Sequence, residues 1–224
     1  MPKIRLALAL LAATAATPAA AATVLDPVGD FLPSYIFDHD ADLDVTSFSV
    51  DFDTATSTFL LGASLAGPVD LTEEGFYVIG VNTGAGAIDP FDDIGNGNVT
   101  FDQLIVLQKD GTATLLGDGA LTAALVGNVF TLSVPLSLLP ASASGFAPEN
   151  YGFNIWPRYG AAVTGNDQIS DFAPDNALLT PHGVVAHSGR WYVPAFDHAR
   201  GELRTLRADR VGAVRVGGRG GPGA

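Results

Sequence analysis

The sequence has no cysteine, few positively charged residues and no long apolar run, and each of these absences argues against a class of protein. Without cysteine the chain forms no disulfide and offers no thiolate ligand or nucleophile. The apolar run, residues 6–16, is shorter than the roughly 20 residues of a membrane-spanning helix, so we expect no membrane span. Residues 23–180 carry 21 Asp and Glu but only Lys109 and Arg158 as fixed cations. This acidity argues against nucleic acid as a partner, because phosphate binding needs a basic face.

Residues 1–22 have the three parts of a secretory signal peptide. Lys3 and Arg5 precede the apolar run, and the alanines at 20–22 offer a cleavage site. No twin-arginine pair precedes the run, so we expect secretion by the general secretory route, to the periplasm, the cell surface or the medium. A retained amphipathic anchor is the alternative. The chain after residue 22 is long enough for one domain with a hydrophobic core.

The body of the chain, residues 23–180, alternates apolar and polar residues with period two, as β-strands do. The alternation is clear in residues 45–53 and 59–65, while residues 76–81 and 99–108 read as more buried strands. Asp-Gly and Gly-Asn pairs then separate short apolar runs, as in β-hairpins. The pattern predicts an all-β fold, an antiparallel jelly-roll-like β-sandwich of about eight to nine strands.

The composition changes near residue 181. Residues 181–224 hold seven Arg against three acids, and the last residues are rich in Gly and Arg. We therefore predict a disordered basic tail over residues 181–224. Two origins stay open: a solvated tail that folds back on the acidic body, or a translated frameshift beyond the natural end of the domain. The predicted division is 1–22 signal peptide, 23–180 β-sandwich and 181–224 tail.

Two stretches near the start of the body carry a family resemblance. The turn Asp-Pro-Val-Gly-Asp at residues 26–30, followed by residues 42–50, resembles the opening of DOMON-like sandwich domains. These are related to family 9 carbohydrate-binding modules and to the C-terminal module of glucodextranase-type enzymes. Residues 151–158 and 168–176 resemble a group of uncharacterised exported bacterial proteins. The resemblance implies a jelly-roll sandwich, a structural calcium at the 26–30 turn, and ligand binding rather than catalysis.

The resemblance does not extend to haem. Cytochrome-type DOMON domains hold haem with a Met/His pair, whereas here the single Met is Met1 and the single His of the body is His39. We therefore expect no haem.

The acidic residues themselves favour calcium. Pro27 and Gly29 permit a sharp turn in which two carboxylates converge beside free backbone carbonyls, the hard oxygen ligands that calcium prefers. The run of alternate acids at residues 38–44 can add carboxylates to the same site. The predicted calcium ligands are Asp26, Asp30, Asp42 and Asp44. The alternatives are an Asx turn and a solvated acidic loop, both without an ion.

The acidic run is not an EF-hand. Counted from Asp38, the sixth position is Leu43, where the loop needs Gly, and the twelfth is Ser49, where it needs Glu.

Two further stretches are candidate binding sites. Residues 89–98 form a loop rich in oxygen donors, which predicts a second metal or a ligand-recognition loop unless it is a plain Gly/Asn loop. Its candidate residues are Asp92, Asp93, Asn96 and Asn98. An aromatic and polar cluster follows at residues 154–159 and suits stacking on a sugar, unless its Trp belongs to the core. Its candidate residues are Asn154, Trp156, Arg158 and Tyr159.

No catalytic constellation stands out, so we do not expect an enzyme. Ser64 is one residue off the Gly-x-Ser-x-Gly elbow, and His182 and His187 lack the spacing and the Glu of a zincin helix. The sequence thus predicts an exported, calcium-stabilised, non-catalytic β-sandwich that binds extracellular carbohydrate, with a polysaccharide or cell-surface glycan as partner. The alternatives are a structural surface or matrix protein without a glycan ligand and, less favoured, a glycoside hydrolase or lyase.

Overall fold

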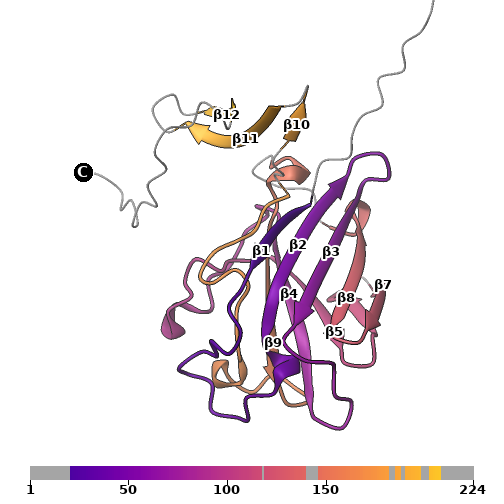
Figure 1. Ribbon diagram of the computed structural model, residues 1–224, viewed down its shortest axis with the longest axis vertical. Helices are drawn as coiled ribbons and strands as arrows, with labels where there is room; N and C mark the ends of the chain where they lie inside the picture. The colour runs from indigo at the N-terminus through magenta and orange to yellow at the C-terminus, as the bar shows by residue number, and fades with distance from the viewer. Residues whose placement is uncertain are drawn as a thin grey trace, which may run out of the picture.

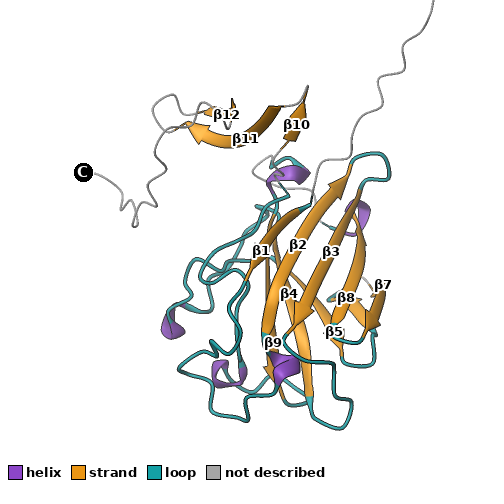
Figure 2. Cartoon of the chain, in the orientation of Figure 1, coloured by secondary structure: helices purple, strands orange, loops and turns teal. Residues whose placement is uncertain are grey.

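Nine antiparallel strands form one curled sheet in the computed structural model, which describes residues 21–117, 119–139, 146–181, 185–187, 190–197 and 202–207 (Figures 1 and 2). The order across the sheet is β1-β2-β3-β8-β7-β6-β5-β4-β9. The strands are β1 (Ala22–Leu25), β2 (Val45–Asp53), β3 (Thr58–Leu65), β4 (Gly75–Asn82), β5 (Gln103–Gln108), β6 (Ala113–Leu115), β7 (Gly119–Val126), β8 (Val129–Pro135) and β9 (Gly152–Tyr159). The predicted all-β, antiparallel architecture is confirmed.

Helical structure in the described residues is limited to single turns. The five 3-10 helices are η1 (Ala41–Leu43), η2 (Asp92–Ile94), η3 (Leu136–Leu138), η4 (Pro148–Asn150) and η5 (Asn166–Gln168). None of these helices approaches the length and apolar character that crossing a membrane requires. The predicted signal peptide falls on residues 1–22, of which 1–20 lie outside the described residues.

The alternating strands bury one face in the main core. Phe48 and Val50 of β2 lie opposite Ala63 and Leu61 of β3, and all four side chains are buried. Because side chains alternate across a strand, Ser49 and Asp51 of β2 face the other way and are only partly buried. The main core continues through β8, β5 and β9.

Strands β4 and β9 are buried on both faces, and this explains their nearly continuous apolar sequence. Their inner face joins the main core, while their outer face packs in a second cluster around Trp156. Loop residues Phe91 and Phe172 belong to that second cluster. The loops before β5 and after β9 therefore cover the outside of the sheet, and the second of them carries part of the candidate site.

A second, three-stranded antiparallel sheet lies near the end of the chain. It consists of β10 (Val185–His187), β11 (Arg190–Asp197) and β12 (Glu202–Arg207), in that order. The pairing runs from Tyr192 opposite Arg207 to Asp197 opposite Glu202. The sequence prediction gave residues 181–224 no regular structure, whereas strands form in three parts of this segment. Residues 208–224, where the tail is richest in Gly and Arg, lie outside the described residues.

Candidate metal centre

The 26–30 turn is fastened to the start of β2. The backbone N–H of Asp26 donates to the carbonyl of Thr46 at 3.0 Å. Gly29 has a φ of 83°, which glycine adopts without strain, and its N–H donates to Asp44 Oδ2 at 2.7 Å. The turn therefore holds its two carboxylates next to Asp44.

The segment after β9 returns to the same place from the far end of the body. The N–H of Val45 donates to Asp171 Oδ2 at 3.0 Å, and the N–H of Leu32 donates to the carbonyl of Ser170 at 2.8 Å. Ser170 Oγ in turn donates to the carbonyl of Leu43 at 2.6 Å. Two chain segments more than a hundred residues apart are thus joined beside the 26–30 turn.

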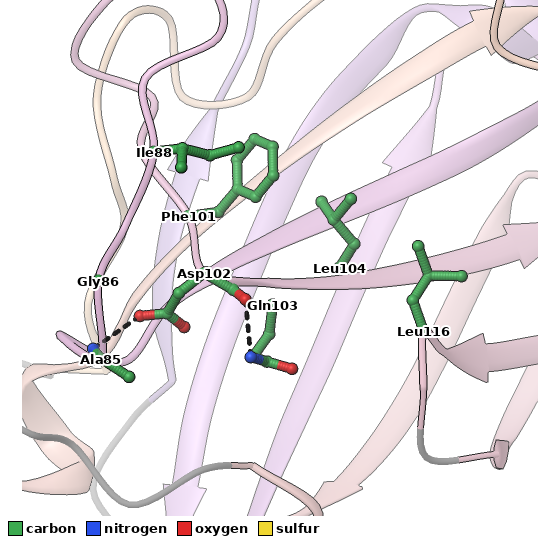
Figure 3. A pocket seen from close by; sticks show the side chains of 8 residues that line it. All are labelled: Ala85, Gly86, Ile88, Phe101, Asp102, Gln103, Leu104 and Leu116. Atoms are coloured by element: carbon green, nitrogen blue, oxygen red, sulfur yellow. Dashed lines mark hydrogen bonds between the residues drawn. The ribbon is translucent and has the colours of Figure 1, made fainter.

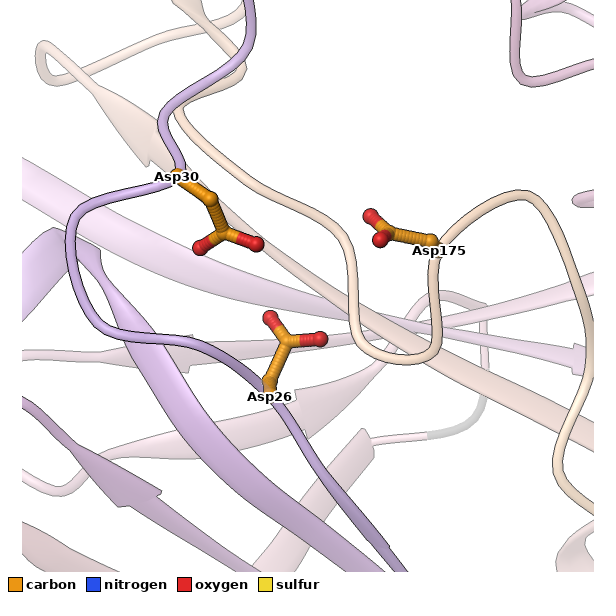
Figure 4. Close-up of side chains that lie close together, drawn as sticks. All are labelled: Asp26, Asp30 and Asp175. Carbon is orange, nitrogen blue, oxygen red and sulfur yellow. The ribbon is translucent and has the colours of Figure 1, made fainter.

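Five carboxylates gather where these segments meet. They form two overlapping groups, Asp26/Asp30/Asp175 and Asp30/Asp44/Asp171, in each of which one oxygen per residue lies within 4.8 Å of the others. Figure 4 shows the carboxylates of Asp26 and Asp30 facing that of Asp175 across the gap between the two segments. Calcium binds oxygens at about 2.3–2.6 Å, so oxygens at these separations can share one ion.

Two of these carboxylates each have a buried oxygen without a hydrogen-bond partner. Asp44 is 3 % exposed, and although its Oδ2 accepts from Gly29, its Oδ1 is buried with no partner among the described residues. Asp26 Oδ2 is also buried without a partner. A buried, unsatisfied carboxylate oxygen is costly to folding. A cation bound by either carboxylate group would supply the missing partner of the oxygen in that group.

Burial and mutual repulsion raise the pKa of four of the five carboxyls. Burial raises the pKa of Asp171 to about 8, and the charge of Asp26 adds to this rise. Burial, then the charges of Asp30 and Asp175, raise the pKa of Asp26 to about 7. Burial, with the charge of Asp30, raises the pKa of Asp44 and Asp175 as well. The site is therefore one that either takes up protons or needs a compensating cation.

Three of the four predicted calcium ligands lie in this centre, and the fourth does not. Asp26, Asp30 and Asp44 are brought together, whereas Asp42 pairs with Lys109, whose Nζ lies 2.8 Å from Asp42 Oδ2.

The sequence prediction also missed two members of the centre, Asp171 and Asp175. Their signal is a second pair of acids separated by a proline: Pro174 lies between Asp171 and Asp175, as Pro27 lies between the two acids of the first turn.

The second predicted loop is hydrogen-bonded to the segment that follows β9. Asp92 and Asp93 lie in η2, and Asp93 accepts a hydrogen bond from Asn166 Nδ2 at 3.2 Å. The N–H of Asn98 donates to Asn176 Oδ1 at 2.9 Å, beside Asp175, and Asn96 is buried. None of the four belongs to either carboxylate group found among the described residues.

The prediction of a sugar-stacking face at residues 154–159 is wrong, because these side chains are covered. Trp156 is 1 % exposed and packs against Phe91 and Phe172 in the second core cluster. Asn154 and Arg158 are buried as well, and Arg158 donates to the carbonyl of Gly165 at 2.9 Å. Tyr159 is partly buried and stacks on Phe37 with ring centroids 4.5 Å apart.

An open cavity of about 490 Å³ lies elsewhere, beside β5 and β6 (Figure 3). Apolar side chains of Ile88, Phe101, Leu104 and Leu116 line most of it. The carboxylate of Asp102 at its edge already accepts hydrogen bonds from the N–H groups of Thr83 and Ala85 and from the Thr83 hydroxyl. The carboxylate of this cavity is thus already engaged in hydrogen bonds, and most of the lining is apolar. The carboxylate centre is therefore the stronger candidate site.

Comparison with known proteins identifies one similarity. Residues 171–216 match the family model of the WYL domain, a domain that usually occurs in nucleic-acid-binding regulators. The matched part begins at Asp171 in the candidate centre and includes β10, β11 and β12. No curated protein and no solved structure matches the chain.

The WYL similarity corrects several sequence predictions. It overturns the resemblance to DOMON-like domains and family 9 carbohydrate-binding modules, the predicted carbohydrate-binding function with its alternatives, and the polysaccharide or cell-surface glycan partner. It also contradicts the exclusion of nucleic acid. The acidity on which that exclusion rests belongs to residues 23–180, whereas residues 181–224 hold seven Arg against three acids.

Proposed function

We propose that the body of this protein is a non-catalytic β-domain that binds a divalent cation, with calcium as the preferred ion. The observation that carries this proposal is Asp44 Oδ1, a deeply buried carboxylate oxygen without a hydrogen-bond partner, grouped with Asp30 and Asp171. All five carboxylates offer hard oxygens, and they sit on loops that can adapt to the irregular coordination of calcium. Export, as residues 1–22 predict, brings such a domain into a calcium-rich medium.

The proposed role of the ion is to hold the two ends of the body together. Asp26 and Asp30 belong to the N-terminal turn, whereas Asp171 and Asp175 belong to the segment after β9. Without a cation their charges repel across this junction. A cation that binds the folded state alone stabilises it by mass action, by about 2.7 kcal/mol at a concentration one hundred times its Kd.

Calcium is expected to raise the melting temperature of the full chain by about 5–10 °C relative to EDTA, for a domain of this size. Asp44→Asn is expected to remove most of this shift. Its amide oxygen can still accept from Gly29, so the turn stays in place, but its NH2 group cannot ligate a cation. Circular-dichroism melts and calorimetric calcium titrations measure both effects.

Asp53→Asn is the matched control for this experiment, since Asp53 lies outside both carboxylate groups and accepts hydrogen bonds from Ala55 and Thr56 in a turn. It removes the same charge and should leave the calcium shift intact. Identical melts in calcium and EDTA, or a full shift in Asp44→Asn, would show that the carboxylates are not a cation site.

A second candidate function is nucleic-acid binding by the C-terminal part of the chain. It is favoured by the WYL similarity of residues 171–216 and by the seven Arg and three acids of residues 181–224. Arginine side chains neutralise phosphates and release counterions, so such binding weakens as salt rises.

The full chain is expected to bind labelled single-stranded DNA or RNA with an affinity that falls steeply between 50 and 200 mM salt. Replacing Arg204 and Arg207 of β12 by Glu should reduce that affinity, since two positive charges of the basic segment would become negative. Fluorescence anisotropy measures it, with Asp44→Asn as a control that should bind as the unaltered chain does. Absence of binding at 50 mM salt would exclude this candidate.

A further inference from the structure

A short loop that carries Asp175 arches over one residue of β9. Phe153 pairs with Leu179 through two backbone hydrogen bonds of 2.8 and 2.7 Å, and Ile155 pairs with Ala173 through two of 3.0 and 2.9 Å. The residue of β9 between these pairs is Asn154. Residues 174–178 leave the strand after the Ala173 pair and return to it at the Leu179 pair, so they pass over the Asn154 side chain.

The Asn154 side chain fills the inside of this loop. It is fully buried, and its Nδ2 donates to the carbonyl of Pro174 at 2.7 Å and to that of Ala177 at 2.9 Å. These two carbonyls lie on either side of Asp175 in the chain. One amide group thus fixes the backbone before and after the carboxylate.

The outer side of the loop is fixed from another direction. Asn176 has a φ of 38°, an uncommon value for a residue with a side chain, and its Oδ1 accepts from the N–H of Asn98 at 2.9 Å. Between these two attachments, the carboxylate of Asp175 lies within reach of those of Asp26 and Asp30. Asp175 is exposed, and repulsion from these two acids would otherwise push its carboxylate away from them.

We propose that Asn154 is a positioning residue for the cation centre, which holds Asp175 in place through the carbonyls of Pro174 and Ala177. This inference rests on the proposed cation-binding function. Ligands held ready in the metal-free protein bind more tightly, because less conformational freedom is lost when the ion arrives. Partners behind the ligands of a metal typically change its affinity by about 10- to 100-fold.

The test is a calorimetric calcium titration of four full chains: unaltered, Asn154→Ala, Asp175→Asn and the double variant. Asn154→Ala is expected to weaken calcium binding about tenfold. In the Asp175→Asn background the same substitution should have little further effect, since the ligand that it positions no longer binds the ion. The group of Asp30, Asp44 and Asp171 keeps calcium binding measurable in that background.

Asn154→Ser covers the case in which Asn154→Ala does not fold, since its hydroxyl retains one donor inside the loop. Near-ultraviolet circular dichroism in EDTA verifies that each variant is folded before titration. An unchanged Kd in a folded variant, or an equal loss with and without Asp175, would refute the positioning role. Failure of the unaltered chain to bind calcium would instead refute the proposed function itself.

Discussion

In EDTA, the protein is expected to become less stable as the pH rises from about 4 to about 8. Burial raises the pKa of Asp171 to about 8 and that of Asp26 to about 7, from an ordinary value of 3.8 in both cases. A carboxyl with a raised pKa in the folded state contributes its stability fully below the unfolded pKa, and this contribution is lost as the pH passes the folded pKa. For Asp171 the loss is on the order of 5 kcal/mol.

Saturating calcium is expected to abolish this loss, because the cation compensates the ionised carboxylates. Urea unfolding at several pH values, with EDTA or with calcium, measures the free energy of unfolding in each state. The direction of the change is diagnostic. Most proteins denature in acid, so their free energy of unfolding increases, rather than decreases, as the pH rises from 4.

Asp171→Asn serves as the control for the pH experiment. Its amide oxygen can still accept from Val45, but the side chain no longer titrates. The variant should show a flatter pH dependence in EDTA and a smaller response to calcium. A metal-free protein whose stability is constant or increases up to pH 8 would contradict the raised pKa of Asp171 and Asp26.

Most strands could be predicted because their signal is local. The alternation in residues 45–53 matches β2, Val45–Asp53, and the Gly-Asn pair at 127–128 separates β7 from β8 as expected. Period-two burial and turn residues are properties of a short window of sequence. The strands β10 to β12 were not predicted, because the basic composition after residue 181 favoured a disordered tail.

The candidate centre was only partly predictable, because its two halves lie far apart in the sequence. The Asp-Pro-x-Gly-Asp turn identifies Asp26 and Asp30 by itself, but nothing local connects it to Asp171. That connection depends on backbone hydrogen bonds such as the one from Val45.

Burial was equally hard to infer from the strand pattern. Trp156 and Asn154 looked like an exposed binding face, because loops that cover the outside of β9 leave no mark in the sequence of the strand itself.

Lys109→Ala is expected to destabilise the protein by about 3–5 kcal/mol, the usual cost of leaving one partner of a buried ion pair uncompensated. Lys109 and Asp42 have side chains that are 6 % and 2 % exposed, with 2.8 Å between Nζ and Oδ2. Lys109 also donates to the carbonyl of Asp70 at 3.2 Å, and the N–H of Asp70 donates to Asp42 Oδ2 at 2.9 Å. Removing the ammonium leaves the Asp42 carboxylate buried among acids. Urea unfolding in saturating calcium measures the loss.

The double variant Lys109→Met/Asp42→Asn separates the charge effect from general damage. Methionine replaces the aliphatic part of Lys109, and the Asn oxygen can still accept from Asp70, so most of the lost stability should return. The same variant also decides whether Asp42 ligates the ion, as its sequence context predicted. Asp42 is paired with Lys109 and lies outside both carboxylate groups, so the double variant should bind calcium as tightly as the unaltered chain. A weaker calcium affinity in this folded variant would show that Asp42 is a calcium ligand. If Lys109→Ala loses less than about 1 kcal/mol of stability, the ion pair is screened by solvent like a surface pair.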